Sequence, residues 1–74
     1  MMEKYYPYRT RDGRRSILEA VGRQDAREWL RMYGKGVRFC EVKLEFSEFM
    51  DWRESDDRAE IVDYYLSQHR NFVT

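Results

Sequence analysis

The clearest alternation of apolar and polar positions lies in the middle of the chain, in the segment VRFCEVKLEF at 37–46. Its apolar side chains alternate with charged ones and are Cys40, Val42, Leu44 and Phe46. Because successive side chains of a strand point to opposite faces, this period of two predicts a half-buried strand. Phe39 breaks the alternation, so it either packs on the second face or marks a bulge.

Two further strands are predicted near the N-terminus, joined by a tight turn. Tyrosines favour a strand over 4–11, and Asp12-Gly13 between two extended segments is a strong hairpin signal. The returning strand covers 14–21, where the adjacent apolar pair Ile17-Leu18 indicates partial cover on both faces. A helix that starts at Ser16 is the competing prediction, because SILEAV also contains good helix formers.

A first helix is predicted in DAREWLRMYG, which follows the hairpin. Asp25 is the expected N-cap, with Glu28 three residues later as its capping-box partner. Gly34 supplies the C-terminal stop. The apolar side chains recur at i, i+3, i+4 and i+7 on one helix face: Ala26, Trp29, Leu30 and Tyr33.

The pattern from Ser47 to Arg70 is helical and contains either one helix or two. Ser47 is the expected cap of a short first segment, which carries Phe49, Met50 and Trp52. Ser55 is the expected cap of a second segment, and the two aspartates after it favour a break there. The second segment shows one apolar stripe at Ala59, Val62, Leu66 and His69, and a flanking one at Ile61, Tyr65 and Phe72.

These elements predict a small α+β fold, a single domain over 1–74. A β-hairpin, a helix and a third strand give a three-stranded, mainly antiparallel sheet, with one or two C-terminal helices packed on one face. A third strand beside the first gives the fully antiparallel order 2-1-3, with helices covering one face. Pro7 argues against a central first strand, because proline cannot donate a ladder hydrogen bond. The order 1-2-3, with its second and third strands parallel, is therefore the alternative.

Composition and charge add a bipolar character. The 74 residues include 16% aromatic side chains, which is more than a disordered chain carries, and the formal net charge is zero. Residues 1–36 hold nine Lys or Arg against five Asp or Glu, a balance of +4, and residues 37–74 hold five against nine, a balance of −4. The densest acidic block, 48–63, has seven acids against two arginines. Such asymmetry suggests a charged partner.

Candidate chemistry for catalysis or metal binding is sparse, so we expect no enzyme, no cofactor and no metal site. The single histidine, His69, and the single cysteine, Cys40, are read as packing residues. One of each cannot form a structural zinc site, and the carboxylates lack the spacing of a calcium loop. Gly34-Lys35-Gly36 lacks the glycine spacing of a phosphate-binding loop and reads as a helix stop with a turn.

The acidic block carries the first functional hypothesis. Aromatic anchors inside a charged rim are typical of protein interfaces, and an acidic helical surface suits a basic partner. We therefore expect a non-enzymatic protein-binding module. Small, motif-free docking proteins of this character include phage and mobile-element inhibitors of host enzymes or defence nucleases, such as anti-CRISPR proteins. The expected binding residues are Glu48, Phe49, Asp51, Trp52, Asp56, Asp57, Glu60 and Asp63.

The arginine-rich hairpin carries the alternative, a nucleic-acid-binding regulator. Arginine binds phosphate bidentately and tyrosine stacks on bases. The expected contact residues are Arg9, Arg11, Arg14, Arg15 and Tyr8. Against this hypothesis, the chain lacks the net positive charge that small nucleic-acid binders carry. The simpler explanation is a charged tip that keeps the sheet edge from aggregating.

Two further expectations concern assembly and location. A homodimer would let the +4 half of one copy meet the −4 half of another. The chain has no apolar segment that could span a bilayer, no secretory signal pattern, and one cysteine, which excludes an internal disulfide. We therefore expect a soluble protein of the cytoplasm, the host cytoplasm if the source is viral, with no membrane partner.

Overall fold

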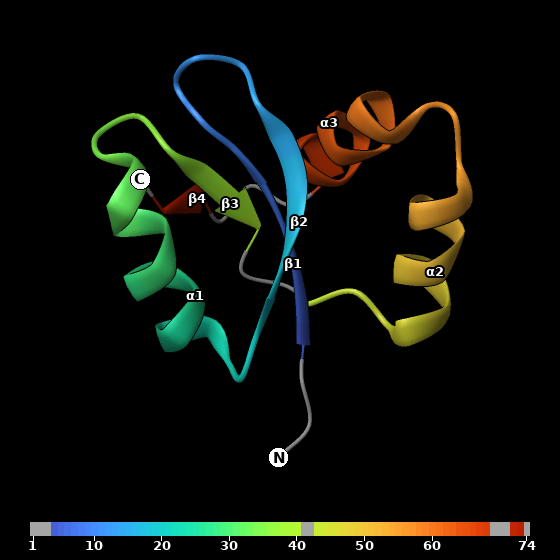
Figure 1. The fold of residues 1–74 in the computed structure, drawn as a ribbon, viewed down its shortest axis with the longest axis horizontal. Helices are drawn as coiled ribbons and strands as arrows, with labels where there is room; N and C mark the ends of the chain where they lie inside the picture. Colours follow the sequence, from blue (N-terminus) through green and yellow to red (C-terminus); the bar gives the residue numbers. More distant parts are fainter. Residues whose placement is uncertain (1–3, 41–42, 69–71, 74) are drawn as a thin grey trace.

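The computed structural model describes residues 4–40, 43–68 and 72–73. The described chain begins with two strands, and helices and further strands follow along these residues (Figure 1). Their bounds are β1 Lys4–Arg9, β2 Arg15–Ala20, α1 Arg23–Leu30, a 3-10 turn η1 Arg31–Tyr33, β3 Arg38–Cys40, α2 Phe46–Glu54, α3 Arg58–Gln68 and β4 Phe72–Val73.

The strands form an antiparallel sheet in the order β2-β1-β3-β4. β1 pairs with β2 along its whole length, from Lys4↔Ala20 to Arg9↔Arg15, and with β3 through Tyr8↔Phe39 and Arg9↔Arg38. The α+β class and the antiparallel order 2-1-3 are thus confirmed. β4, at the outer side of β3, was not predicted, because Phe72 was assigned to a helical stripe.

The turn between β1 and β2 is closed by three residues, 11–13. The Thr10 N–H donates to the Arg14 carbonyl at 2.8 Å, and the Gly13 N–H donates to the Thr10 carbonyl at 3.1 Å. Gly13 has φ +94°, a conformation that only glycine adopts without strain. The Asp12-Gly13 hairpin prediction is therefore confirmed, and a helix starting at Ser16 is excluded.

Pro7 lies in the central strand, β1, although a proline was expected at an edge of the sheet. The Leu44 N–H donates to the Tyr5 carbonyl, so the backbone groups of Tyr5 point toward the β3 side of β1. The backbone groups of every second residue in a strand point to the same side, so the nitrogen of Pro7 also points toward β3. Phe39 pairs with Tyr8 and Leu44 pairs with Tyr5, so a separation of five residues on the facing chain corresponds to a separation of three residues on β1. The ladder is interrupted opposite Pro7, so the missing donor breaks no regular pairing.

Helices cover both faces of the sheet, and Figure 1 shows α1 on one side and α2 with α3 on the other. The expectation that helices would cover one face holds for α2 and α3 only. The reason lies in two adjacent apolar pairs, Ile17-Leu18 and Phe39-Cys40, which place one side chain on each face. The core cluster between the sheet and α1 consists of Tyr6, Tyr8, Leu18, Ala20, Ala26, Leu30, Val37 and Phe39. The core cluster between the sheet and the helices α2 and α3 consists of Ile17, Cys40, Leu44, Phe49, Val62 and Leu66.

The strand predicted for 37–46 is much shorter in the structure. β3 ends at Cys40, Leu44 makes a single bridge to Tyr5, and Phe46 begins α2 with a side chain that is 62% exposed. Val42 lies outside the described residues. Phe39 is buried on the face of the sheet that α1 covers, opposite to Cys40. This agrees with the interpretation in which Phe39 packs on the second face of the strand.

Three helix caps differ from the sequence prediction. Ser55 is the C-terminal cap of α2 and not the N-cap of α3, which begins at Arg58 with its first backbone bond from the Ile61 N–H to the Asp57 carbonyl. α1 begins at Arg23 after Gly22, so Asp25 is in the first turn, where its Oδ2 accepts the Val21 N–H at 3.1 Å. α2 begins after Glu45 rather than Ser47, and the Glu45 N–H donates to Glu48 Oε1 at 2.9 Å. A carboxylate three residues inside the helix serves as the capping-box partner in this case.

The predicted apolar stripes are correct only in part. Leu30 and Ala26 are buried as expected, whereas Trp29 and Tyr33 are about half exposed. In α3, Val62 and Leu66 are buried, whereas Ala59 is exposed and His69 lies outside the described residues. The break at Ser55 is confirmed, since α2 and α3 are separate helices.

Candidate functional site

A groove of about 560 Å³ lies between α2 and α3 on the acidic side of the molecule. It is lined by Glu48, Asp51, Trp52, Ser55, Asp57, Glu60, Ile61, Tyr64 and Tyr65. Four of these residues are acids, three are aromatic, and none is basic. We call this set the acidic groove.

The corner between the two helices fixes one wall of the acidic groove. The Ser55 N–H donates to the Trp52 carbonyl at 3.1 Å and ends α2, and Ser55 Oγ accepts the Asp57 N–H at 3.1 Å. The Trp52 indole Nε1–H donates to the Arg58 carbonyl at 3.0 Å. The indole is thereby tied to the start of α3, and its ring has a defined orientation in the groove.

Glu48 fixes the other wall through both of its carboxylate oxygens. Oε1 accepts the Glu45 N–H, and Oε2 accepts the Tyr65 hydroxyl at 3.3 Å. Burial raises the pKa of Tyr65, and the neighbouring negative charge of Glu48 raises it further. The phenol therefore stays protonated and donates to Glu48, which holds α2 and α3 at a fixed spacing.

Two of the residues expected to bind a protein are used inside the fold instead. Phe49 is 7% exposed, and its ring stacks on Tyr5 with centroids 4.1 Å apart, so it belongs to the core. Asp63 Oδ1 accepts from Arg15 Nε at 2.9 Å and lies 3.8 Å from Arg9 Nη1. These ion pairs connect the two oppositely charged halves within one molecule, and Arg15 and Asp63 are 48 residues apart in sequence.

The remaining residues that were expected to bind a protein lie at or near the surface. Glu48, Asp51, Trp52, Asp57 and Glu60 line the acidic groove, and Asp56 is exposed at the corner between the helices. Tyr64 and Tyr65 were not among the expected binding residues. Tyr64 is 59% exposed, and its position off both apolar stripes of α3 was the signal that could have identified it.

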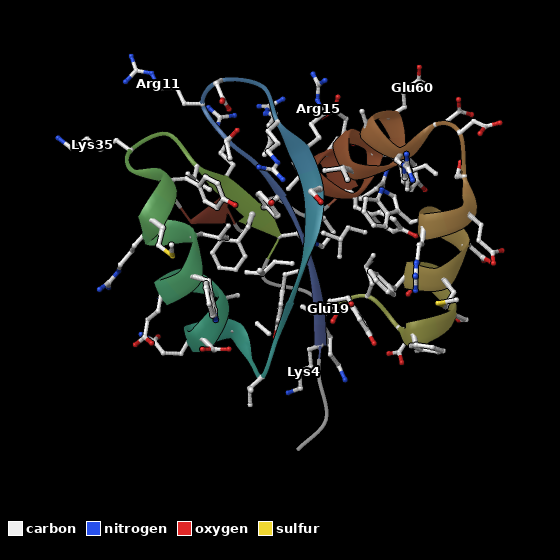
Figure 2. All side chains as sticks on the ribbon, in the orientation of Figure 1. Lys4, Arg11, Arg15, Glu19, Lys35 and Glu60 are labelled. Carbon is white, nitrogen blue, oxygen red and sulfur yellow. The ribbon has the colours of Figure 1, made fainter. Side chains whose placement is uncertain are left out.

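A basic surface occupies the end of the sheet that carries the hairpin turn. One hollow there is lined by Arg9, Thr10, Arg11, Gly13, Arg15, Gly36 and Arg38. A second is lined by Thr10, Arg11, Asp12, Tyr33 and Lys35. We call the residues of these two hollows the basic end; Figure 2 shows Arg11 and Lys35 projecting outward there from neighbouring loops.

The residues that were expected to contact nucleic acid differ in how accessible they are at the basic end. Arg11 and Arg14 are exposed, whereas Arg9 and Arg15 are paired with Asp63. Tyr8 is 5% exposed and lies in the core, so it cannot stack on a base. Lys35, Arg38 and Tyr33 were not expected there, because their position depends on how the loop after α1 folds back beside the hairpin.

Of the two groups considered for catalysis, the structure describes only one. Cys40 is a buried thiol, and His69 lies outside the described part of the chain. Within 4–40, 43–68 and 72–73, no group of three or more His, Cys, Asp or Glu side chains is placed to hold a metal ion. No helix in the same ranges is long and apolar enough to cross a membrane.

Comparison with known proteins adds no relative. A scan against protein-family models found no match, and searches of curated proteins and of solved structures found none either. The features of the molecule that bear on its function are therefore the acidic groove and the basic end.

Proposed function

We propose that this protein is a non-enzymatic binding module whose acidic groove receives a basic segment of another protein. The observation that carries the proposal is the set of four carboxylates around three aromatic rings in one groove. Carboxylates attract Lys and Arg side chains from a distance, and aromatic faces bind the same cations at contact. The groove thus favours a basic, extended partner segment.

The rigidity of the acidic groove supports the same proposal. Trp52 and Tyr65 are held by hydrogen bonds to Arg58 and Glu48, so these rings lose little conformational freedom when a partner binds. Tyr64 packs edge-to-face on Tyr65 with centroids 5.7 Å apart and leaves most of its ring exposed. Fixed aromatic side chains beside charged ones are the usual energetic centre of a protein interface.

The biological role that fits this binding is inhibition by occupation. Enzymes and nucleases that act on nucleic acid carry basic clefts, and an acidic surface competes for such a cleft by charge complementarity. We extend the proposal to a phage or mobile-element inhibitor of a host enzyme or defence nuclease, acting in the cytoplasm. The size of the chain and its separated charges support this extension.

Binding of an arginine-rich peptide tests the acidic groove directly. Replacing Trp29 with Phe leaves Trp52 as the single tryptophan, so its fluorescence reports on the groove. We expect the peptide to change this fluorescence and to bind less tightly as salt rises. The double change Asp51→Lys and Glu60→Lys should weaken binding about tenfold or more, because two attractive charges become repulsive.

The matched control reverses two acids that lie outside the groove, Glu19→Lys and Glu28→Lys, both exposed. It makes the same change in net charge and should weaken binding far less. Equal weakening by both double variants would show a response to net charge alone and would contradict a site in the groove. Circular dichroism of each variant checks that the fold is kept.

A further inference from the structure

We propose that the basic end is a second, independent site, and that it binds single-stranded nucleic acid through phosphate contacts and one stacking ring. This site does not depend on the acidic groove. Its residues differ from those expected from the sequence, since the exposed ring is Tyr33 and the added cations are Lys35 and Arg38.

The charge of the basic end is strongly one-sided. Its two hollows contain Arg9, Arg11, Arg15, Lys35 and Arg38 and a single acid, Asp12. The Asp12 carboxylate accepts from the Thr10 hydroxyl and faces the Arg14 N–H at 3.5 Å, and the Thr10 contact is the main reason that its pKa is lowered. Asp12 is therefore engaged within the turn. Arg9 and Arg15 are paired with Asp63, so the outward positive charge comes mainly from Arg11, Lys35 and Arg38.

Arg11 connects the two hollows, since it lines both. Its side chain lies along Gly36, where an added Cβ would come within 3.1–3.3 Å of the Arg11 stem. Gly36 has φ +87° and lets the loop approach the hairpin this closely. The Arg11 stem is thus supported by the loop, and Arg11 shares one hollow with Arg38 and the other with Lys35.

Tyr33 supplies an exposed ring beside these cations. It is 47% exposed, and its ring lies 5.9 Å from that of Tyr8, centroid to centroid. Tyr8 is buried, and its pKa is raised mainly by this burial and further by the neighbouring Tyr33 side chain. Tyr8 therefore holds Tyr33 in place, while the outer part of the Tyr33 ring is free to meet a ligand.

An exposed aromatic ring next to a row of cations suits a single strand better than a duplex. The backbone of a single strand follows the cations, and its unpaired bases offer faces for stacking. In a duplex the base faces are covered by their neighbours, so Tyr33 would contribute nothing. Single strands also bind without sequence preference in this mode, which agrees with one stacking ring and no set of base-reading side chains.

Fluorescence anisotropy with a labelled single-stranded oligonucleotide of about 12 nucleotides, as DNA and as RNA, tests the site. The full chain should bind at low salt, and the triple change Arg11→Ala, Lys35→Ala and Arg38→Ala should reduce the salt slope by about 2, since each phosphate contact contributes about 0.7. Tyr33→Leu should weaken binding about tenfold, whereas Tyr33→Phe should keep most of the affinity.

Matched controls lie on the acidic half of the molecule and outside the acidic groove, where Arg53→Ala and Phe46→Leu change an exposed arginine and an exposed aromatic ring. Neither should alter binding. The proposal is overturned if the wild-type chain does not bind either oligonucleotide at low salt, or if Tyr33→Leu binds as well as wild type. Equal competition by inorganic polyphosphate would reduce the site to general anion binding, and equal affinity for a duplex would exclude the stacking role.

Discussion

Asp63 is the residue at which the two charged halves of the chain meet. Its carboxylate lies between Arg15 at 2.9 Å and Arg9 at 3.8 Å, and so connects α3 with both strands of the hairpin. The side chains of Arg15 and Asp63 are 36% and 39% exposed, so solvent weakens the attraction considerably. Asp63 therefore orients α3 on the sheet more than it stabilises the domain.

Reversal of this charge gives a residue-scale prediction. Asp63→Lys should lower the free energy of unfolding by about 1 kcal/mol, because a third cation then faces Arg9 and Arg15. Asp51→Lys, at an exposed position of α2, should change it by less than about half of that. Urea denaturation at low salt and in about 1 M NaCl measures both, and salt should shrink the loss at Asp63. Equal losses at the two positions would argue against the ion pairs.

The start of α2 gives a prediction at the scale of an element. Glu48→Ala removes an acceptor for both the Glu45 N–H and the Tyr65 hydroxyl, and should lower the free energy of unfolding by about 1–2 kcal/mol. Ser47→Ala should be neutral or slightly stabilising, because Ser47 lies within the helix and alanine is the better helix former. Thermal and urea unfolding compare the two variants. A larger loss of unfolding free energy in Ser47→Ala than in Glu48→Ala would indicate that Ser47 caps α2.

Strong local signals made the elements predictable, and long-range contacts limited their bounds. The Asp12-Gly13 turn and the break at Ser55 depend on neighbouring residues and were read correctly. β3 was predicted too long, because alternation in 37–46 cannot show that β1 pairs with it only as far as Tyr8. The Pro7 position depends on the same interruption, which no local pattern reveals. β4 depends on pairing with β3 and was missed for this reason.

At the scale of the whole molecule, three tyrosines couple stability to alkaline pH. The pKa values of Tyr6, Tyr8 and Tyr65 are raised above the ordinary 10.0, with burial as the main cause. The unfolded chain therefore loses these protons at a lower pH than the folded one. Stability should be fully present below about pH 10 and fall as pH rises through the raised values.

Urea unfolding at a series of pH values from about 8 to 11 checks this dependence. Tyr8→Phe removes one of the three groups and should make the decline less steep. Tyr64→Phe, at an exposed position, is the control. A decline that is equally steep in Tyr8→Phe and wild type would contradict the assignment to buried tyrosines.

The candidate sites were predictable in charge but not in shape. The opposite charges of the two halves are visible in the sequence, and three acids of the predicted binding surface, Asp51, Asp57 and Glu60, line the acidic groove. Tyr33 could not be paired with the arginines in advance, because only the fold brings the end of α1 to the hairpin turn. The same holds for Phe49, whose burial depends on Tyr5 in a distant strand.

The two-sided cover of the sheet has a consequence for synthesis on the ribosome. β1, β2, α1 and β3 are complete once residue 40 has been added, whereas α3 ends at Gln68. The 28 residues from 41 to 68 take on the order of seconds to add, at about 5–20 residues per second. Until α2 and α3 are available, a chain that has formed the layer around α1 leaves Ile17 and Cys40 on an uncovered face. That face is the surface a chaperone would need to shield.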